Sequence, residues 1–278
     1  MFALGIVLTA TFLEEIAGTL GKKAVARRAE TLYGLGFLTL FYASVAMIGA
    51  VIFFGADFRF SPASLPYFIP RIILEFFVYT VALKALTSED RSTYAFLRLI
   101  TIPLLLVADI IIGYTVGPAQ LLGSVVIFGA IITLLATHTL NRRGMKYVLI
   151  AAAVAPITIS LYKYNISHFN SVAAEQLITY LLLISYFTWL GWYKKHERPW
   201  RYLLKPIPEI QSLFQGLGNV MISFAYTLAP ASVILSANRA GALLWAILFG
   251  NVYFHERHLY MKFVAYGLVI SGLILLVI

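Results

Sequence analysis

Long apolar runs dominate the chain, and short polar segments separate them. A transmembrane helix needs about 20 mostly apolar residues to cross a hydrocarbon core of about 30 Å. The runs, and the Gly, Pro and polar residues that break them, predict ten such helices. They cover residues 1–21, 32–54, 67–87, 94–114, 120–138, 147–164, 171–193, 209–229, 231–253 and 260–278. The pattern excludes a transmembrane β-barrel, whose strands alternate apolar and polar residues over about ten positions.

The composition places these helices in a membrane. Hydrophobic residues make up 61% of the chain, charged residues make up 12%, and the mean hydropathy is +0.87. Because soluble domains carry about 25% charged residues, this chain lacks the polar side chains to cover a surface facing water. Cysteine is absent, which excludes disulfides and thiolate metal sites. We therefore expect an all-α, multi-pass protein of the cell membrane with the lipid bilayer as a partner.

The net charge of +9 comes from basic residues in alternate connectors. Sixteen lie in the odd-numbered connectors: Lys22, Lys23, Arg27, Arg28, Lys84, Arg91, Arg142, Arg143, Lys146, Lys194, Lys195, Arg198, Arg201, Lys205, Arg257 and Lys262. The even-numbered connectors hold only Arg59, Arg71 and Lys163. Because cytoplasmic loops are enriched in Lys and Arg, we expect the odd connectors in the cytoplasm and both termini outside. Lipid headgroups account for the charge, and no nucleic-acid partner is expected.

The two remaining basic residues, Arg98 and Arg239, fall inside predicted helices, 141 positions apart. The segments around them, VALKALTSEDRSTYAFLRLI and SFAYTLAPASVILSANRAGA, are weakly similar. Each leads through an apolar stretch to a glycine-bearing last helix. Five helices per half is an odd number, so the second copy must be inverted relative to the first. We predict one transmembrane domain of two inverted five-helix repeats, residues 1–141 and 142–278.

The segment LAPASVILSANRAGALLWAILFGNVYFHERHLYMKFVAYGLVISGLILLVI resembles EamA-type members of the drug/metabolite transporter superfamily. Its counterpart YAFLRLITIPLLLVADIIIGYTVGPAQLLGSVVIFGAIITLL follows the same pattern. The pattern has an Ala-Pro-Ala-like start, a long helix, a loop glutamate (Glu256) and a glycine-rich last helix. The resemblance implies a cavity lined mainly by the third, fourth, eighth and ninth helices, and metabolite or drug-like solutes as cargo. Pro103 matches the family's proline in the fourth helix, whereas the ninth helix has Leu244 or Trp245 there, and family members usually keep both termini in the cytoplasm.

Polar residues within the third and eighth predicted helices are candidates for a substrate site, because a charge at a helix centre costs about 2.5 to 3.5 kcal/mol. Arg71, Glu75 and Tyr79 share one face of the third helix. The alternative is a structural Arg71–Glu75 pair, with Arg71 reaching the membrane interface. The eighth helix carries a polar stripe, which indicates either a wet cavity or hydrogen bonds to a neighbouring helix. Its members are Gln211, Gln215, Asn219, Ser223 and Tyr226.

The fourth and ninth predicted helices carry the two intramembrane arginines. Tyr94, Arg98 and Asp109 share a face of the fourth helix. Arg98 lies about 6 Å inside the membrane at 1.5 Å per residue, so an interfacial anchor is an alternative role. Because guanidinium groups bind carboxylates and phosphates in bidentate fashion, an anionic substrate group held between Arg98 and Arg239 is one hypothesis. Further candidates on the ninth helix are Asn238 and Trp245.

Two adjacent carboxylates, Glu14 and Glu15, interrupt the first predicted helix. Neighbouring residues on a helix point about 100° apart, so we expect one to face a central cavity and the other a neighbouring helix or the interface. A desolvated carboxyl group has a raised pKa and exchanges a proton more readily near neutral pH. Proton coupling through Glu14, Glu15 and Asp109 is therefore one hypothesis. A static ion pair with Arg98 or Arg239 is the alternative.

These patterns favour a transporter and not an enzyme. The chain contains no GxxxxGK[ST] phosphate loop, and its HERH segment lacks the HExxH spacing. We expect a secondary active transporter, an exporter or exchanger of a small polar or amphipathic metabolite, acting by alternating access as a monomer or homodimer. No cofactor or metal is expected. A membrane-embedded enzyme acting on a lipid through Glu14, Glu75 or Asp109 is the alternative.

Overall fold

The computed structural model describes residues 2–112, 117–137, 144–229 and 231–277, and within these ranges the chain contains helices and no strand. The predicted all-α class is therefore confirmed. The nine longer helices are α1 (Phe2–Ala26), α2 (Leu32–Phe54), α3 (Leu65–Ser88), α6 (Pro118–Ala136), α7 (Met145–His168), α8 (Val172–Lys195), α9 (Pro206–Leu228), α10 (Ala231–Phe254) and α11 (Leu259–Val277). The shorter ones are α4 (Arg91–Arg98), α5 (Thr101–Ile112) and the 3₁₀ helices η1 (Pro62–Ser64) and η2 (Pro199–Leu204).

Seven of the described helices are long and apolar enough to cross a membrane: α1, α2, α6, α7, α8, α10 and α11. Large apolar side chains on the outer faces of several helices are exposed. On α6, for example, Val125 is 65% exposed and Ile132 is 61% exposed. A soluble protein rarely exposes a continuous apolar surface of this kind, whereas lipid tails contact it without cost.

The predicted helix over 94–114 is not continuous, because it is interrupted between α4 and α5. Proline lacks an N–H group, and its ring clashes with the carbonyl four residues earlier, which for Pro103 is that of Leu99. The backbone accordingly changes to 3₁₀-type hydrogen bonds at this point, from the N–H of Leu99 to Phe96 (3.1 Å) and from the N–H of Ile100 to Leu97 (3.2 Å). Pro103 therefore breaks the fourth predicted helix just beyond Arg98.

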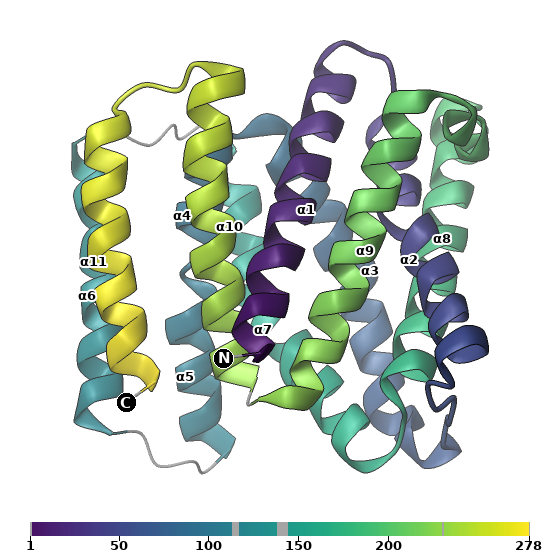
Figure 1. Cartoon of the computed structure of the whole chain (residues 1–278), viewed down its shortest axis with the longest axis horizontal. Helices are drawn as coiled ribbons and strands as arrows, with labels where there is room; N and C mark the ends of the chain where they lie inside the picture. Colours follow the sequence, from purple (N-terminus) through teal and green to yellow (C-terminus); the bar gives the residue numbers. More distant parts are fainter. Residues whose placement is uncertain (1, 113–116, 138–143, 230, 278) are drawn as a thin grey trace.

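The connectors α1–α2, α8–α9 and α10–α11 lie together on one side of the molecule, at the top of Figure 1. We call this the basic side, because these connectors hold many of the Lys and Arg residues. The start of α1 and the end of α11 lie on the opposite side (Figure 1). Both ends of the described chain are thus on one side, as an even number of crossings requires.

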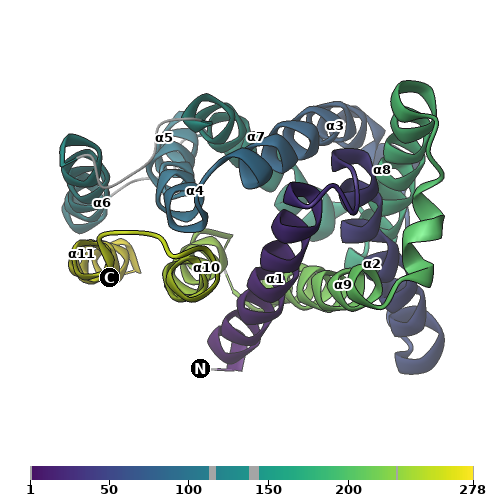
Figure 2. The same ribbon diagram turned by 90° about the horizontal axis from the view of Figure 1, so that it is seen from above.

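Seen from above, the helices form two rows (Figure 2). One row contains α11, α10, α1 and α9, and the other contains α6, α5 with α4, α7 and α3, while α2 and α8 lie at the end opposite α6 and α11. The backbones of α6 and α11 approach closely where Gly123 and Gly272 face each other. Small residues of this kind allow transmembrane helices to pack closely. The rows leave the polar residues of α1, α3 and α9 on inward-facing surfaces.

Candidate functional site

A polar cavity of about 160 Å³ lies between α1, α3, α7, α8 and α9. Its lining consists of Glu14, Arg71, Glu75, Tyr79, Thr158, Ile159, Tyr162, Gln176, Thr179, Tyr180, Asn219, Ile222, Ser223 and Tyr226. These residues come from both halves of the sequence. On α3, α7, α8 and α9 the lining is displaced away from the basic side, because it uses the first part of α3 and α8 and the last part of α7 and α9.

Six of the predicted site residues line this cavity: Glu14, Glu75, Tyr79, Asn219, Ser223 and Tyr226. The helical spacing that placed Glu75 and Tyr79 on one face of α3 is therefore observed. In the polar stripe of α9, the last three members line the cavity, whereas Gln211 and Gln215 do not. The Gln215 amide instead donates to the Asn219 side chain at 3.2 Å.

Six other predicted residues lie on described positions outside the cavity lining: Glu15, Tyr94, Arg98, Asn238, Arg239 and Trp245. The guanidinium group of Arg98 lies over the ring of Tyr94, 5.1 Å from the ring centre. Arg239 is buried on α10 and donates to the side chain of Asn238 at 3.2 Å. The indole N–H of Trp245 is also buried and has no hydrogen-bond partner among the described residues.

The two intramembrane arginines are nevertheless near the cavity. Arg98 and Arg239 both lie close enough to Glu14 for a direct electrostatic interaction. Within the described ranges, neither forms an ion pair with it. Asp109 is part of α5, but its side chain falls outside the part of the chain that the structure describes.

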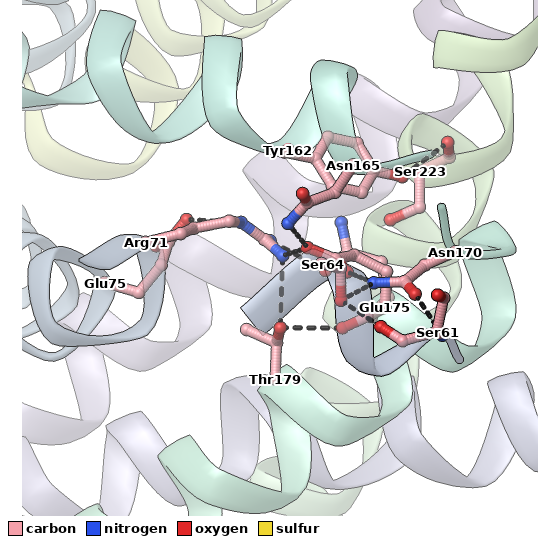
Figure 3. A network of polar contacts seen from close by, with 11 residues as sticks. Ser61, Ser64, Arg71, Glu75, Tyr162, Asn165, Asn170, Glu175, Thr179 and Ser223 are labelled. Carbon is pink, nitrogen blue, oxygen red and sulfur yellow. Dashed lines mark hydrogen bonds and ion pairs between the residues drawn. The ribbon is translucent and has the colours of Figure 1, made fainter. Parts of the chain in front are cut away.

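Arg71 makes its shortest ion-pair contact with α8 and a longer one within its own helix. Its Nη1 atom lies 2.6 Å from Oε1 of Glu175 and donates to Thr179 at 3.2 Å, whereas its Nε atom lies 3.9 Å from Glu75. Figure 3 shows this pair at the centre of a polar network. The alternative Arg71–Glu75 pair is thus present as a longer contact, but its second part is wrong, because Arg71 is 2% exposed and does not reach the interface. The partner from α8 satisfies the guanidinium group within the bundle.

Glu175 is fully buried and is itself supported by two amides (Figure 3). Asn165 donates to Oε1 at 3.0 Å, and Asn170 donates to Oε2 at 2.5 Å. Sequence reasoning missed Glu175, because an acid in the first turn after the N-cap residue Ser171 looks like ordinary helix-start chemistry. The sequence did carry a signal for Glu175: it is a carboxylate inside a predicted membrane helix, with no basic residue close to it in the sequence.

Tyrosine side chains and hydroxyl groups form much of the remaining wall. The Tyr162 hydroxyl donates to the backbone carbonyl of Ser223 at 3.1 Å, and the Tyr180 hydroxyl lies 3.2 Å from Oγ of Ser223. Tyr226 packs edge-on against the ring of Tyr162. These contacts join α7, α8 and α9 and fix the rings around the cavity.

The adjacent carboxylates of α1 have different environments, as their angular separation predicts. Glu14 faces the cavity, and Glu15 forms a buried ion pair with Arg91 at the start of α4. The sequence suggested Arg98 or Arg239 as the ion-pair partner of these acids. In the structure, the ion-pair partner of Glu15 is Arg91. The side chain of Arg91 reaches α1 because Gly18, one turn after Glu14, leaves room for its guanidinium group.

Polar contacts close the bundle on the basic side. Glu256, in the α10–α11 connector, accepts hydrogen bonds from the backbone N–H groups of Arg91 (2.5 Å) and Ser92 (3.3 Å) and pairs with Lys262 at 3.0 Å. Glu89, at the end of α3, accepts from the N–H group before α7. Arg91 and Lys262, assigned to connectors from the sequence, are buried residues at helix starts.

A second buried acid, Glu30, lies on the basic side in the α1–α2 connector. It is 3% exposed, and neither of its carboxylate oxygens has a hydrogen-bond partner among the described residues. Burial raises the pKa of Glu30 to about 8, although the nearby Gln211 amide and Lys205 act in the opposite direction. Burial likewise raises the pKa of Glu89, which the N–H group of Gly144 partly offsets.

No protein-family model matches the chain, and no curated protein matches it by sequence. A solved structure described as "Crystal structure of protein" has the same fold, with a TM-score of 0.69 and 13% sequence identity. The alignment covers 98% of this chain and 95% of that chain. At this identity the likeness concerns the fold alone. Together with the apolar spans, it defines the class: the chain is a helical membrane protein with several membrane-spanning helices.

Proposed function

We propose that this protein is a secondary active transporter, an exporter or exchanger that moves a small polar or amphipathic metabolite across the cell membrane by alternating access. The observation that carries the proposal is the cavity itself, a polar space with ionisable walls inside a bundle of apolar helices. Intramembrane ionisable residues that face a cavity typically mark a solute or ion pathway. Proton coupling through Glu14 belongs to the proposal as one of its two mechanisms, and exchange is the other.

The helix packing supports an inverted-repeat architecture of the drug/metabolite transporter type. An inverted repeat exchanges α1 with α7, α3 with α9 and α6 with α11. The packing of α1 on α9 is then matched by that of α7 on α3, and α6 packs on α11. The Gly123–Gly272 contact is reciprocal, because a Cβ atom on either residue would meet the carbonyl oxygen of the other. Reciprocity of this kind is what a two-fold axis generates.

The unequal closure of the two sides supports alternating access. The basic side is closed by the Glu15–Arg91 and Glu256–Lys262 pairs, whereas the cavity lies toward the opposite side. Transporters of this architecture expose a central site to one side at a time by moving one group of helices against the other. In this proposal, the cavity opens toward the basic side only after these two ion pairs separate.

Flux into proteoliposomes tests the function. The purified protein would be reconstituted and supplied with labelled amines, amino acids, nucleosides and phosphorylated metabolites, with and without a pH gradient. We expect saturable flux of one of these classes, lost in Glu75→Gln and retained in Glu209→Gln, which removes an exposed carboxylate of α9. Chemical conversion of a lipid without solute flux would overturn the proposal in favour of an enzyme.

A further inference from the structure

The charged side chains that face the cavity differ in how far other protein groups already pair with them. Arg71 contributes the one guanidinium group of the described lining. Glu175, which does not line the cavity, compensates this charge at 2.6 Å. Its remaining polar contacts go to Thr179 at 3.2 Å and to Gln176 at 3.5 Å, and its guanidinium group lies 4.8 Å from the centre of the Tyr162 ring. The charge of Arg71 is therefore already compensated by Glu175, although its Nε atom has no hydrogen-bond partner among the described residues.

The two carboxylates of the lining are less well satisfied. Glu14 has neither a hydrogen bond nor an ion pair among the described residues, although Arg98 and Arg239 lie near enough to interact with its charge. Glu75 has the 3.9 Å approach of Arg71 Nε as its ion-pair contact, and the Thr158 side chain lies beside it. An ionised carboxylate removed from water without a partner is unfavourable. A bound cation would offset that cost at Glu14 and Glu75 together.

Tyrosine rings complete the site. Tyr79, Tyr162, Tyr180 and Tyr226 all line the cavity. Tyr226 is 7% exposed. Faces of aromatic rings attract ammonium groups, and clusters of them recognise quaternary ammonium ligands. Carboxylates beside aromatic rings therefore favour an organic cation over a hydrated metal ion, and the described residues contain no group of three metal-binding side chains.

We propose that the cavity binds a compact organic ammonium ion, with its positive charge near the carboxylates of Glu14 and Glu75 and its carbon atoms against the surrounding tyrosine rings. The volume of about 160 Å³ limits the ligand to a small molecule. This inference rests on the proposed function in treating the cavity as the solute site, and it names the solute class. Arg98 and Arg239 lie outside the lining, so the hypothesis of an anion between them requires a different site.

Three solutes of similar shape and different charge test the inference. They are tetramethylammonium, tert-butanol and trimethylacetate, each titrated calorimetrically into the purified full-length protein in a non-ionic detergent. We expect tetramethylammonium to bind at least about tenfold more tightly than the other two, a difference of about 1.4 kcal/mol. Glu14→Gln and Glu75→Gln should each weaken its binding at least about tenfold, whereas Glu209→Gln, an exposed change of the same charge, should leave it unchanged.

A conservative variant distinguishes the loss of the carboxylate charge from a loss of folding. Glu75→Asp retains the carboxylate and should bind tetramethylammonium within a few-fold of the wild type, while its melting temperature reports on folding. Equal binding of the three solutes, binding of none, or preferential binding of trimethylacetate that is lost in Arg98→Ala would overturn the inference. Binding of the cation without flux in proteoliposomes would instead reject the transporter proposal and leave the binding site standing.

Discussion

Arg71 on α3 and Glu175 on α8 form an ion pair of 2.6 Å, with at most 3% of either side chain exposed. The pair joins two helices through residues that are 104 positions apart in the chain. Breaking a buried pair by removing one partner leaves an uncompensated charge, which costs far more than the pair itself contributes. The pair therefore fixes the wall of the cavity at the point where α3 and α8 meet.

Replacing Glu175 should destabilise the fold strongly. Glu175→Gln keeps the size of the side chain but leaves the Arg71 guanidinium group buried without a counter-ion, so we expect a loss of about 3–5 kcal/mol. Unfolding by titration with a denaturing detergent measures this loss. Glu75→Gln is the matched control, because its contact with Arg71 is 3.9 Å long. Similar losses in the two variants would contradict the assignment of Glu175 as the main partner.

Replacing the two adjacent acids of α1 should affect the melting temperature differently. Glu15→Gln removes the counter-ion of buried Arg91 and should lower the melting temperature by several degrees. Glu14→Gln removes a charge that has no ion pair among the described residues, so it should leave the melting temperature unchanged or raise it while reducing solute binding or flux. Thermal unfolding of both variants, alongside the binding titration, checks this. Loss of stability in Glu14→Gln and none in Glu15→Gln would reverse the assignment.

Close packing of α6 on α11 should depend on Gly123. A Cβ atom at this position would lie 2.5 Å from the carbonyl oxygen of Gly272, so Gly123→Ala must push two backbones apart. We expect a cost of about 1–3 kcal/mol, as for other overpacked sites. Gly129→Ala, on the same helix, is the control, because no neighbouring helix lies within 4 Å of the position that its methyl group would occupy. A neutral Gly123→Ala would show that the helices separate freely.

Stability should fall with rising pH because of Glu30. The folded protein raises the pKa of Glu30 from 4.5 to about 8, so between these values the folded state binds more protons than the unfolded state. Stability then decreases as pH rises through this interval. Glu30→Gln should melt like the wild type at about pH 5 and at least about 2 °C higher at about pH 9.

Melting temperatures measured across this pH range test the prediction. Glu209→Gln, which changes an exposed acid, should follow the wild-type profile at every pH. A Glu30→Gln profile parallel to that of the wild type would mean that Glu30 is not the titrating group.

Helix positions were largely predictable, because they depend on local chemistry. The predicted helix 32–54 coincides with α2. Thr31 accepts from the N–H of Gly34 at its start, and Gly55 ends it with a φ of 64°, a left-handed conformation that glycine adopts at low cost. Pro103 carried the signal for the break between α4 and α5, but the apolar run around it concealed the interruption.

Partners of the polar residues were less predictable, because helical spacing defines a face of a helix and not what that face contacts. The spacing placed Glu75 with Tyr79 and the α9 stripe on common faces, and these faces meet in the cavity. It also suggested an Arg71–Glu75 pair within one helix, whereas the shorter contact comes from Glu175 on another.

The sequence by itself determined that this chain folds as apolar helices in a membrane, since hydropathy and helix-ending residues act over a few turns. Only the tertiary structure decided that Glu14 faces a cavity while Glu15 pairs with Arg91, and that Glu175 neutralises Arg71. The physical reason is that the energy of a buried charge depends on the groups within a few ångströms of it. In this bundle those groups come from helices distant in sequence.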